Sequence, residues 1–116
     1  MPQYDQRTAI EELFAEFPAV RSDLSSSMVG LFSIEMGCFA RYIQKQIDSG
    51  NREEVGRCYE WLVKLTLNGD DKVKNAVGFS VLDHLVTRDG KVERQWALEA
   101  MPPLLRASYE KSARGT

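Results

Sequence analysis

The stretch 51–86 constrains the fold of this chain most, because its apolar residues recur at helical spacing in two successive segments. In the segment 51–67, Val55, Cys58 and Leu62 share one stripe, and charged side chains line the opposite face. The segment 72–86 has no polar stripe, since its apolar residues point in nearly every direction around a helix axis. A turn at 68–71 separates the two. We therefore predict a helical hairpin whose second helix lies buried at the centre of an all-α domain.

The remaining apolar pattern predicts a compact bundle of five to six helices. We expect helices over 5–17, 28–48, 51–67 and 72–86, a fifth from Val92 to Pro102, and a short last one from Pro103. The phrase D-D-K-V-K-N-A-V at 70–77 resembles the second helix of a HEAT repeat, so the central hairpin is HEAT-like. Stacked repeats usually need three or more copies, and only one pair is visible. A compact bundle is therefore favoured over a solenoid.

The expected helix ends follow from capping residues. Pro18 should end the first helix, and the serine-rich segment up to Ser27 should be a surface connection that supplies the next N-cap. Gly50 suits a left-handed position after the second helix, and Asn51 with Glu54 has the spacing of a capping box. Pro103 can occupy the first turn of the last helix. This last helix should dock Leu104, Leu105 and Tyr109, residues 112–116 should fray, and 87–90 should form a turn.

Length and charge limit the classes of protein to consider. The 116 residues fit a single helical domain, 1–116, and a hydrophobic content of 43% is enough for an ordinary core. The formal net charge of −2 argues against a polyanion as the main partner. Cys38 and Cys58 are the only cysteines, and both fall at apolar helical positions, so we expect reduced core residues. No apolar run could span a bilayer and no leader is recognisable, so we expect a cytoplasmic protein.

Four polar residues interrupt the apolar pattern and are candidates for buried polar positions: Glu35, Gln46, Asn75 and His84. Glu35 lies inside the apolar arc of the second helix, so it is either an internal hydrogen-bonded support, which we favour, or a pocket residue. His84 is expected in the core or at its boundary, because no further metal ligands have a suitable spacing. We expect no metal, no cofactor and no catalytic residue.

Three glycines, Gly37, Gly56 and Gly78, fall inside predicted helices, where each costs about 1 kcal/mol relative to alanine. Close packing between helices is the favoured reason for them, and room for the backbone of a partner is the alternative. These two explanations predict different surroundings for the missing side chain.

The outer face of the helix 51–67 offers the best-defined candidate for a partner-binding surface. It comprises Glu53, Glu54, Arg57, Glu60 and Trp61. Glu53 with Arg57 and Glu60 with Lys64 have the i, i+4 spacing of ion pairs. An ordinary solvated face is the simpler interpretation, and Trp61 is either half-buried core or an interface anchor.

Three segments together resemble a family of small all-α bacterial proteins of poorly known biochemistry. They are I-E-M-G-C-F-A-R-Y-I at 34–43, N-R-E-E-V-G-R-C-Y-E-W-L at 51–62 and N-G-D-D-K-V-K-N-A-V-G-F at 68–79, within a resemblance over residues 30–86. Members of such families are often found beside polymorphic or contact-dependent toxins and are thought to act as their immunity proteins. The resemblance implies signature positions at Glu35, Asp71 and Asn75, without a defined site chemistry.

We therefore expect a non-enzymatic protein-binding module, most plausibly an immunity protein that neutralises a cognate toxin by direct binding. The alternative is a helix-turn-helix regulator that would use Lys72, Lys74, Asn75 and Arg88. Its acidic pI and the apolar circumference of the second hairpin helix count against nucleic acid. A small enzyme that uses Glu35 and His84 is the last choice.

Overall fold

The protein is described here by a computed structural model that covers residues 3–22, 24, 31–85 and 92–114. Its described α-helices are α1 (Gln6–Glu16), α2 (Pro18–Ser22), α3 (Phe32–Asp48), α4 (Arg52–Asn68), α5 (Asp71–Ala76), α6 (Val92–Ala100) and α7 (Pro103–Arg114). A π-helix, η2 (Val77–Val81), and a 3₁₀-helix, η3 (Leu82–His84), follow α5 directly. In the described part of the chain there is no strand, and the one bridge joins Tyr4 to Gly69. The all-α prediction is confirmed.

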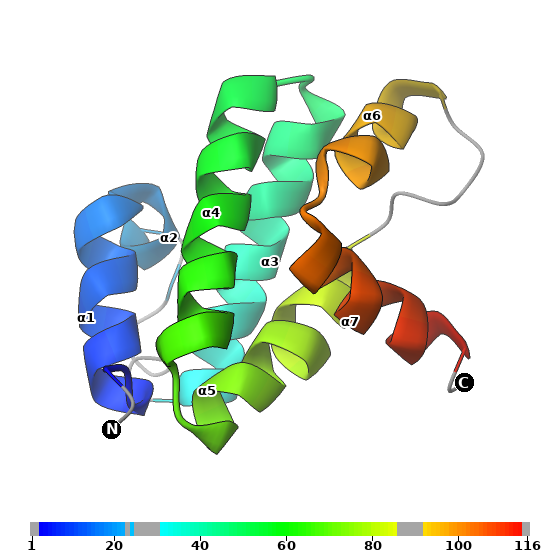
Figure 1. Cartoon of the computed structure of the whole chain (residues 1–116). Helices are drawn as coiled ribbons and strands as arrows, with labels where there is room; N and C mark the ends of the chain where they lie inside the picture. Colours follow the sequence, from blue (N-terminus) through cyan, green and yellow to red (C-terminus); the bar gives the residue numbers. More distant parts are fainter. Residues whose placement is uncertain (1–2, 23, 25–30, 86–91, 115–116) are drawn as a thin grey trace.

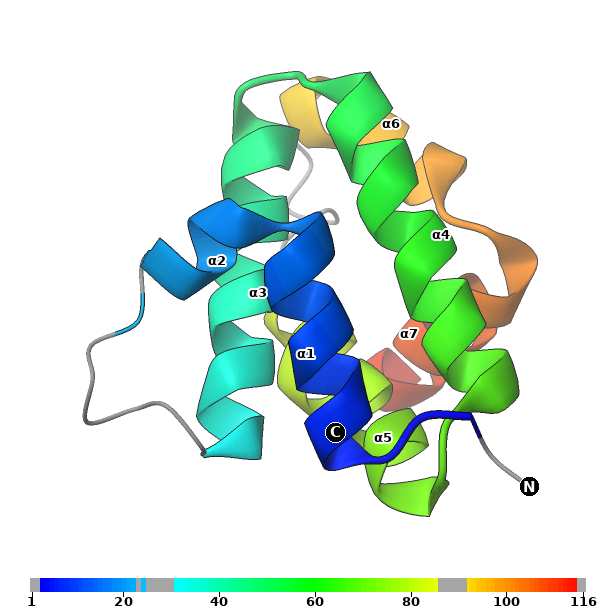
Figure 2. The same ribbon diagram turned by 90° about the vertical axis from the view of Figure 1, so that its left-hand side faces the viewer.

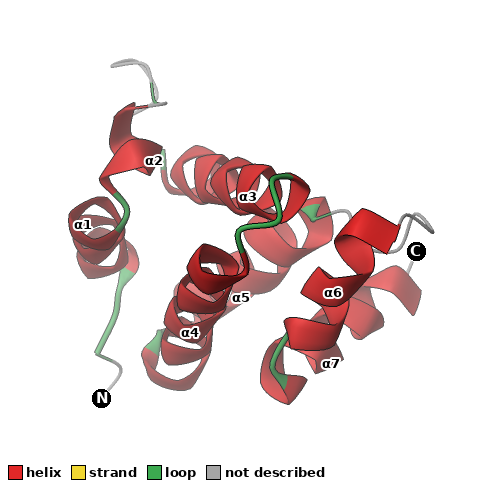
Figure 3. Cartoon of the chain, turned by 90° about the horizontal axis from the view of Figure 1, so that it is seen from above, coloured by secondary structure: helices red, strands yellow, loops and turns green. Residues whose placement is uncertain are grey.

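The helices form three layers (Figures 1 and 3). The α1–α2 pair covers one side of α3 and α4, and the α6–α7 pair covers the opposite side. Between them, α3 packs against α1, α2, α4, α6, η2 and η3, and so contacts both outer pairs. The predicted helix after the turn, which is α5–η2–η3 in the structure, packs against α1, α3, α4 and α7, so it shares the central position with α3.

The first predicted boundary needs a correction at Pro18. This proline does not lead into an irregular connection, because it is the first residue of the short helix α2. Proline is well suited to the first turn of a helix, where its missing N–H has no partner to lose. Val20 and Leu24 are buried against the rest of the core, so this segment contributes packing as well as a link. The expected caps at 25–27 and the first residues of the helix 28–48 lie outside the described residues.

The junction between α3 and α4 forms largely as its sequence predicts. Gly50 has a φ of 74°, which is the left-handed conformation that glycine adopts without strain. The side chain of Asn51 accepts a hydrogen bond from the backbone N–H of Glu54 at 3.3 Å. The reciprocal half of the predicted capping box is absent, because the Asn51 N–H donates to the carbonyl of Gln46 at 2.9 Å. Gln46 is half-buried and its side-chain oxygen also accepts from Asn51, so it supports this junction rather than filling the core.

The element α5–η2–η3 is where the predicted helix 72–86 departs most from a regular α-helix. The buried residues Val73, Val77, Val81 and Leu85 repeat every four positions. On a regular α-helix of 3.6 residues per turn, each such step would drift by about 40° around the axis. The π-helical turn takes up the extra residue and keeps this series facing the core. On a 3.6-residue wheel these four residues cover only about 120°, and the apolar circumference comes from adding Ala76, Phe79 and Leu82. Of these three, Phe79 is exposed in the structure.

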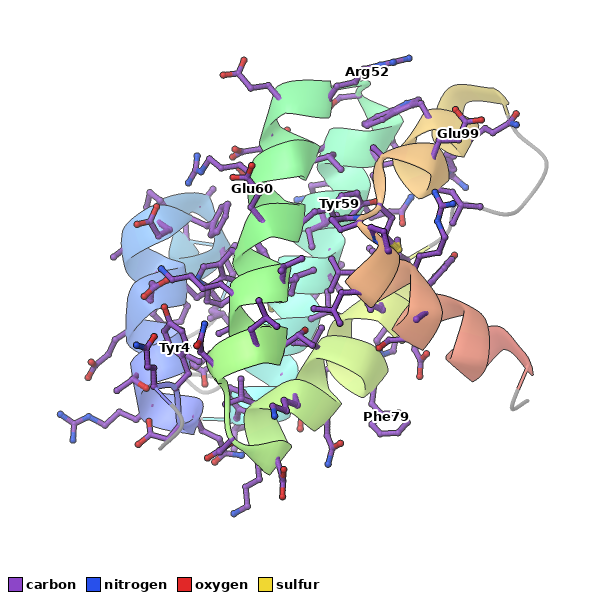
Figure 4. All side chains as sticks on the ribbon, viewed as in Figure 1. Tyr4, Arg52, Tyr59, Glu60, Phe79 and Glu99 are labelled. Atoms are coloured by element: carbon purple, nitrogen blue, oxygen red, sulfur yellow. The ribbon has the colours of Figure 1, made fainter. Side chains whose placement is uncertain are left out.

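The same change of register decides which side chains leave the core. Without it, Ser80 and His84 would follow Val77 toward the interior. In the structure His84 is exposed, and the Phe79 ring is 67% exposed and projects away from the ribbon (Figure 4). The predictions that this helix is buried on all sides and that His84 is a core histidine are therefore wrong. Val86 and the turn 87–90 lie outside the described residues.

The C-terminal pair is attached to the middle layer by two tyrosines. Tyr59 on α4 donates a hydrogen bond to the carbonyl of Ala97 at 2.8 Å, and Tyr109 on α7 donates to the carbonyl of Leu85 at 3.1 Å. Leu105 is buried as predicted, whereas Leu104 is partly exposed. Helix α7 begins at Pro103, as expected, and runs to Arg114, so 112–114 are helical rather than frayed.

The N-terminal residues pair with the turn between α4 and α5 (Figure 2). The Tyr4 N–H donates to the carbonyl of Asn68 at 3.1 Å, and the Asp70 N–H donates to the carbonyl of Tyr4 at 2.9 Å. Gly69 lies in this turn, where a Cβ would come within 2.5 Å of the Leu65 carbonyl oxygen. A glycine is therefore required at this position by a close approach of the backbone.

Candidate functional site

The predicted charged face of α4 is only partly a surface. Glu53 and Glu60 are exposed, but Trp61 is buried, at 5% exposure. Its indole N–H donates to the carboxylate of Glu12 on α1 at 2.8 Å. Trp61 is therefore a contact between α1 and α4 in the free protein, which corrects its assignment to a partner-binding surface.

Arg57 and Glu54 also face the α1–α2 side of the molecule. The Arg57 guanidinium pairs with Glu54 at 3.0 Å, lies over the ring of Phe17 at 4.4 Å from its centroid, and donates to the carbonyl of Glu16. The second carboxylate oxygen of Glu54 accepts a hydrogen bond from the hydroxyl of Tyr42. These contacts join α4 to α1 and α3, so the exposed part of the predicted surface reduces to Glu53, Glu60 and the outer edge of Arg57.

Both ion pairs expected along α4 are replaced by others. Arg57 pairs with Glu54 rather than Glu53, and Lys64 pairs with Glu12 of α1 at 3.1 Å rather than with Glu60. The Glu12 side chain is only 26% exposed, so solvent and salt weaken its ion pair with Lys64 less than they would weaken a pair between two exposed side chains. Sequence spacing alone could not indicate this partner, which lies 52 residues away.

Glu12 is the polar centre of the α1–α4 contact. Its carboxylate accepts hydrogen bonds from Tyr4 at 2.8 Å, Trp61 at 2.8 Å and Lys64 at 3.1 Å. Burial raises the pKa of this carboxyl, but the three hydrogen bonds outweigh burial and hold the pKa below its ordinary value. The arrangement stabilises the ionised form and offers no free acid or base.

The two cysteines are buried and free, as predicted. Burial, and then the nearby carboxylate of Glu54, raise the pKa of the Cys58 thiol well above its ordinary value. A protonated thiol is a poor nucleophile and a poor metal ligand. Within the described residues, no group of three or more His, Cys, Asp or Glu side chains could hold a metal ion.

Glu35 lines a cleft of about 440 Å³ between α1 and the start of α3, which we call the α1–α3 cleft. Its other lining residues are Gln6, Arg7, Ile10, Glu11, Phe14 and Phe32. The Glu35 side chain is buried, at 3% exposure, as predicted. Its burial fits an internal hydrogen-bonded support, and its position beside the cleft fits a pocket residue. The preference for the first of these roles stays a prediction.

A second depression, which we call the α3 groove, runs along the outer face of α3. It measures about 430 Å³ and is lined by Ile34, Gly37, Ala40, Arg41 and Gln44 of α3 and by His84 of η3. His84 and Glu35 thus line different depressions, so the structure does not bring together the pair considered for an enzyme. No residue of this groove had been selected as a binding residue from the sequence, apart from the candidate His84 and the glycine at position 37.

Helix α5 exposes the polar residues that a nucleic-acid-binding helix would use. Lys72, Lys74 and Asn75 are all exposed, which corrects the prediction that Asn75 is buried. The apolar circumference expected for this helix therefore does not hold as an argument against nucleic acid. Arg88 lies outside the described residues.

The three helix-interior glycines are not explained by internal packing. A Cβ built on Gly37, Gly56 or Gly78 meets no atom within 4 Å. The favoured explanation, close helix packing, is therefore wrong for all three. Gly69 is the glycine that does lie in a tight contact. The sequence predicted the turn that contains it, but not the close approach of neighbouring atoms.

Comparison with known proteins places the chain in a family. Residues 10–115 match the family described as Domain of unknown function (DUF7674). The chain belongs to this family. The match extends from within α1 through α7, and so includes the whole α3 groove and all of the α1–α3 cleft except Gln6 and Arg7. No curated protein and no solved structure gives a significant match.

Proposed function

We propose that this member of the DUF7674 family is a non-enzymatic, cytoplasmic protein-binding module, and that its partner is a bacterial toxin domain which it neutralises by direct binding. The observation that carries the proposal is the exposure of large apolar side chains on two elements that pack against each other. On α3 and its N-cap, Ile34 is 41% and Leu31 50% exposed, and Phe79 on the neighbouring η2 is 67% exposed. Exposed apolar side chains on a rigid helical surface are typical of protein interfaces.

The rigidity of this surface supports a binding role. Next to these exposed residues, Met36, Phe39 and Val77 are buried and anchor α3 and η2 in the core. Little side-chain ordering is then needed when a partner binds, which lowers the entropic cost of association. A protein that blocks its target needs only such a surface, without reactive groups of its own.

The toxin as partner rests on the resemblance of residues 34–43, 51–62 and 68–79 to immunity-protein-like families. These segments belong to α3, to α4 with its cap, and to the turn and helices that follow α4. They therefore cover the middle layer and the exposed Ile34 and Phe79. Immunity proteins are commonly encoded beside their toxins, so the product of the adjacent gene is the first partner to test.

The proposal is tested by capture of that purified gene product on the tagged chain. We expect the wild type to bind it and to restore growth of cells that express it. Replacing both Ile34 and Phe79 with serine should weaken capture at least about tenfold, which corresponds to about 1.4 kcal/mol. Leu67→Ser is the matched control, because Leu67 is also a largely exposed apolar side chain but lies on α4. No capture by the wild type, or equal capture by all variants, would count against the proposal.

The charged face of α4 is tested in the same assay. Glu53 and Glu60 can both be reversed to lysine while Glu54 keeps its contacts with Arg57 and Tyr42. If this face lies at the rim of the interface, association should slow and lose its salt dependence, because exposed charges act mainly on encounter. Unchanged association in low salt would remove Glu53 and Glu60 from the interface.

The nucleic-acid alternative has one observation in its favour, the exposure of Lys72 and Lys74 on α5. Asp70 and Asp71 immediately precede them, and the whole chain carries a net charge of −2. Two lysines beside two aspartates leave little local positive charge for phosphate contacts. Salt-dependent binding to duplex DNA that is lost when both lysines are replaced with glutamine would favour this alternative.

A further inference from the structure

The α3 groove has the shape and spacing of a surface against which another helix packs. Ile34, Gly37, Arg41 and Gln44 recur along α3 at intervals of three and four, so they share one face of the helix. Leu31, the N-cap of α3, is half exposed but has an extended backbone and does not line the groove. The face is apolar at its N-terminal end and basic toward its C-terminal end.

Gly37 marks the point of closest approach. It lies in the interior of a seventeen-residue helix, yet a Cβ at this position would meet no atom within 4 Å. A glycine within a helix weakens that helix, and no contact with the described residues requires one here. Glycine also lets a foreign backbone come nearer than any side chain would allow. The missing side chain therefore leaves room on the outside of the protein.

The charge of the groove indicates the chemistry of what fits it. Among the described residues, its lining contains one cation, Arg41, the neutral amide of Gln44 and the imidazole of His84, and no carboxylate. The Gln44 amide donates to the carboxylate of Asp48, which lies outside the lining, at 3.1 Å. The Arg41 guanidinium donates a hydrogen bond to the sulfur of Cys38 at 3.5 Å. Asp48, one turn beyond Gln44, already pairs with Arg94 at 2.8 Å. An acidic side chain in the groove would thus meet Arg41 without a competing carboxylate from the lining.

We propose that the α3 groove is the docking site for one helix of the protein partner, which places its backbone over Gly37, an apolar side chain against Ile34 and a carboxylate against Arg41. This inference rests on the proposed protein-binding function and specifies its surface and the chemistry of its partner. In helix-in-groove recognition the docked helix presents apolar anchors at i, i+3 and i+4, and one such anchor would contact Ile34. A bidentate contact between Arg41 and a carboxylate would fix the direction and register of the docked helix.

The groove is less suited to nucleic acid. A single arginine gives one phosphate contact, whereas binding to a duplex uses several, and the apolar side chain of Ile34 would face the charged backbone. A second copy of this chain is another conceivable occupant, and the test below separates it from a partner protein.

The test uses a displayed library of helical peptides as the probe, selected on the full-length chain. Gly37→Leu places a side chain in the groove, and Gly56→Leu is its matched control on α4, where a Cβ also meets open space. Both variants should keep or raise the melting temperature, because each removes a helix-interior glycine. We expect peptides that bind the wild type and Gly56→Leu but not Gly37→Leu, with Asp or Glu three or four positions from Leu, Ile or Phe.

Arg41→Glu provides a second measurement that does not alter the shape at Gly37. Selected peptides should bind Arg41→Glu and Gly37→Leu at least about tenfold more weakly than the wild type, as measured by fluorescence anisotropy. Lys72→Glu, a charge reversal of an exposed lysine on α5, should leave their affinity unchanged. The library contains no product of the adjacent gene, so this result and the capture result can fail independently.

Three outcomes would overturn the inference. One is that no peptide distinguishes Gly37→Leu from Gly56→Leu. Another is that the discriminating peptides carry Lys or Arg in place of Asp or Glu. The third is that the groove binds something other than a partner helix. Duplex DNA binding that requires Arg41 would show this, and so would a dimer, detected by light scattering, that dissociates only in Gly37→Leu.

Discussion

The indole of Trp61 donates its N–H to the carboxylate of Glu12 across 2.8 Å, joining α4 to α1 over 49 residues of sequence. Tyr4 and Lys64 donate to the same carboxylate. One acidic side chain thus satisfies three donors at the edge of the core, and this contact helps to bury Trp61, which the sequence left as either half-buried core or an interface anchor.

Replacing Glu12 with glutamine should lower the free energy of unfolding by about 1 to 2 kcal/mol, because a neutral amide cannot accept all three bonds and places its own N–H₂ among donors. Urea denaturation followed by Trp61 fluorescence measures the change. Glu11→Gln is the control, since Glu11 forms only an exposed pair with Arg7 and should change stability by less than about 0.5 kcal/mol. Equal effects of the two substitutions would contradict the role assigned to Glu12.

The contribution of Glu12 should also depend on pH. Burial raises the pKa of its carboxyl and the bonds from Tyr4, Lys64 and Trp61 lower it more, so the folded pKa is below the ordinary value of 4.5. A lowered folded pKa means that the stabilisation is fully present above the unfolded pKa and disappears as the pH falls through the folded pKa. The stability difference between wild type and Glu12→Gln should therefore be constant above about pH 5 and shrink in more acidic solution. If this stability difference instead grew as the pH fell, the folded pKa of Glu12 would lie above its ordinary value, contrary to the prediction.

Two glycine substitutions should act in opposite directions. Gly37→Ala should raise the free energy of unfolding by about 0.5 to 1 kcal/mol, because alanine is the better helix former and its Cβ meets open space. Gly69→Ala should lower it by about 1 to 3 kcal/mol, because the new Cβ would collide with the Leu65 carbonyl and with Val73. Thermal melts by circular dichroism compare the two. The same sign for both would contradict the placement of these glycines.

The π-helical register of η2 can be tested with a pair of aspartates. Val81→Asp should unfold the domain or cost more than about 3 kcal/mol, because it places a charge in the core. Phe79→Asp should be tolerated, since Phe79 is largely exposed. Far-ultraviolet circular dichroism and melting temperature give the answer. A regular α-helix would instead bring position 80 inward, and Ser80→Asp would then be the most damaging of the three.

Glu35→Gln separates the two roles left open for this buried carboxylate. If Glu35 is an internal support, the free energy of unfolding should fall by about 1 to 3 kcal/mol, as expected when a buried charged group loses its hydrogen-bonding partners. Chemical denaturation measures this effect, and capture of the adjacent gene product measures binding. Unchanged stability together with lost capture would assign Glu35 to the α1–α3 cleft as a binding residue.

The sequence by itself determined the helical class, most helix positions and several helix ends. These features depend on local interactions: the apolar period, the φ preference of Gly50, the side-chain cap of Asn51 and the fixed ring of Pro103. Each of these interactions involves residues only a few positions apart, so the amino-acid sequence alone is enough to predict them. The buried state of Cys38, Cys58 and Glu35 also followed, because their positions within an apolar arc are local as well.

Only the tertiary structure decided which polar groups meet and which faces remain open. Lys64 and Trp61 could not be assigned to Glu12 from spacing, since that contact depends on how α1 packs on α4. The exposure of Phe79 and His84 depends on a π-helical turn, which accompanies the burial of Val73, Val77, Val81 and Leu85 at every fourth position. The open space at Gly37 likewise exists only once the neighbouring helices are in place. Contacts between segments distant in sequence are set by the shape of the packed core, and a local pattern contains no measure of that shape.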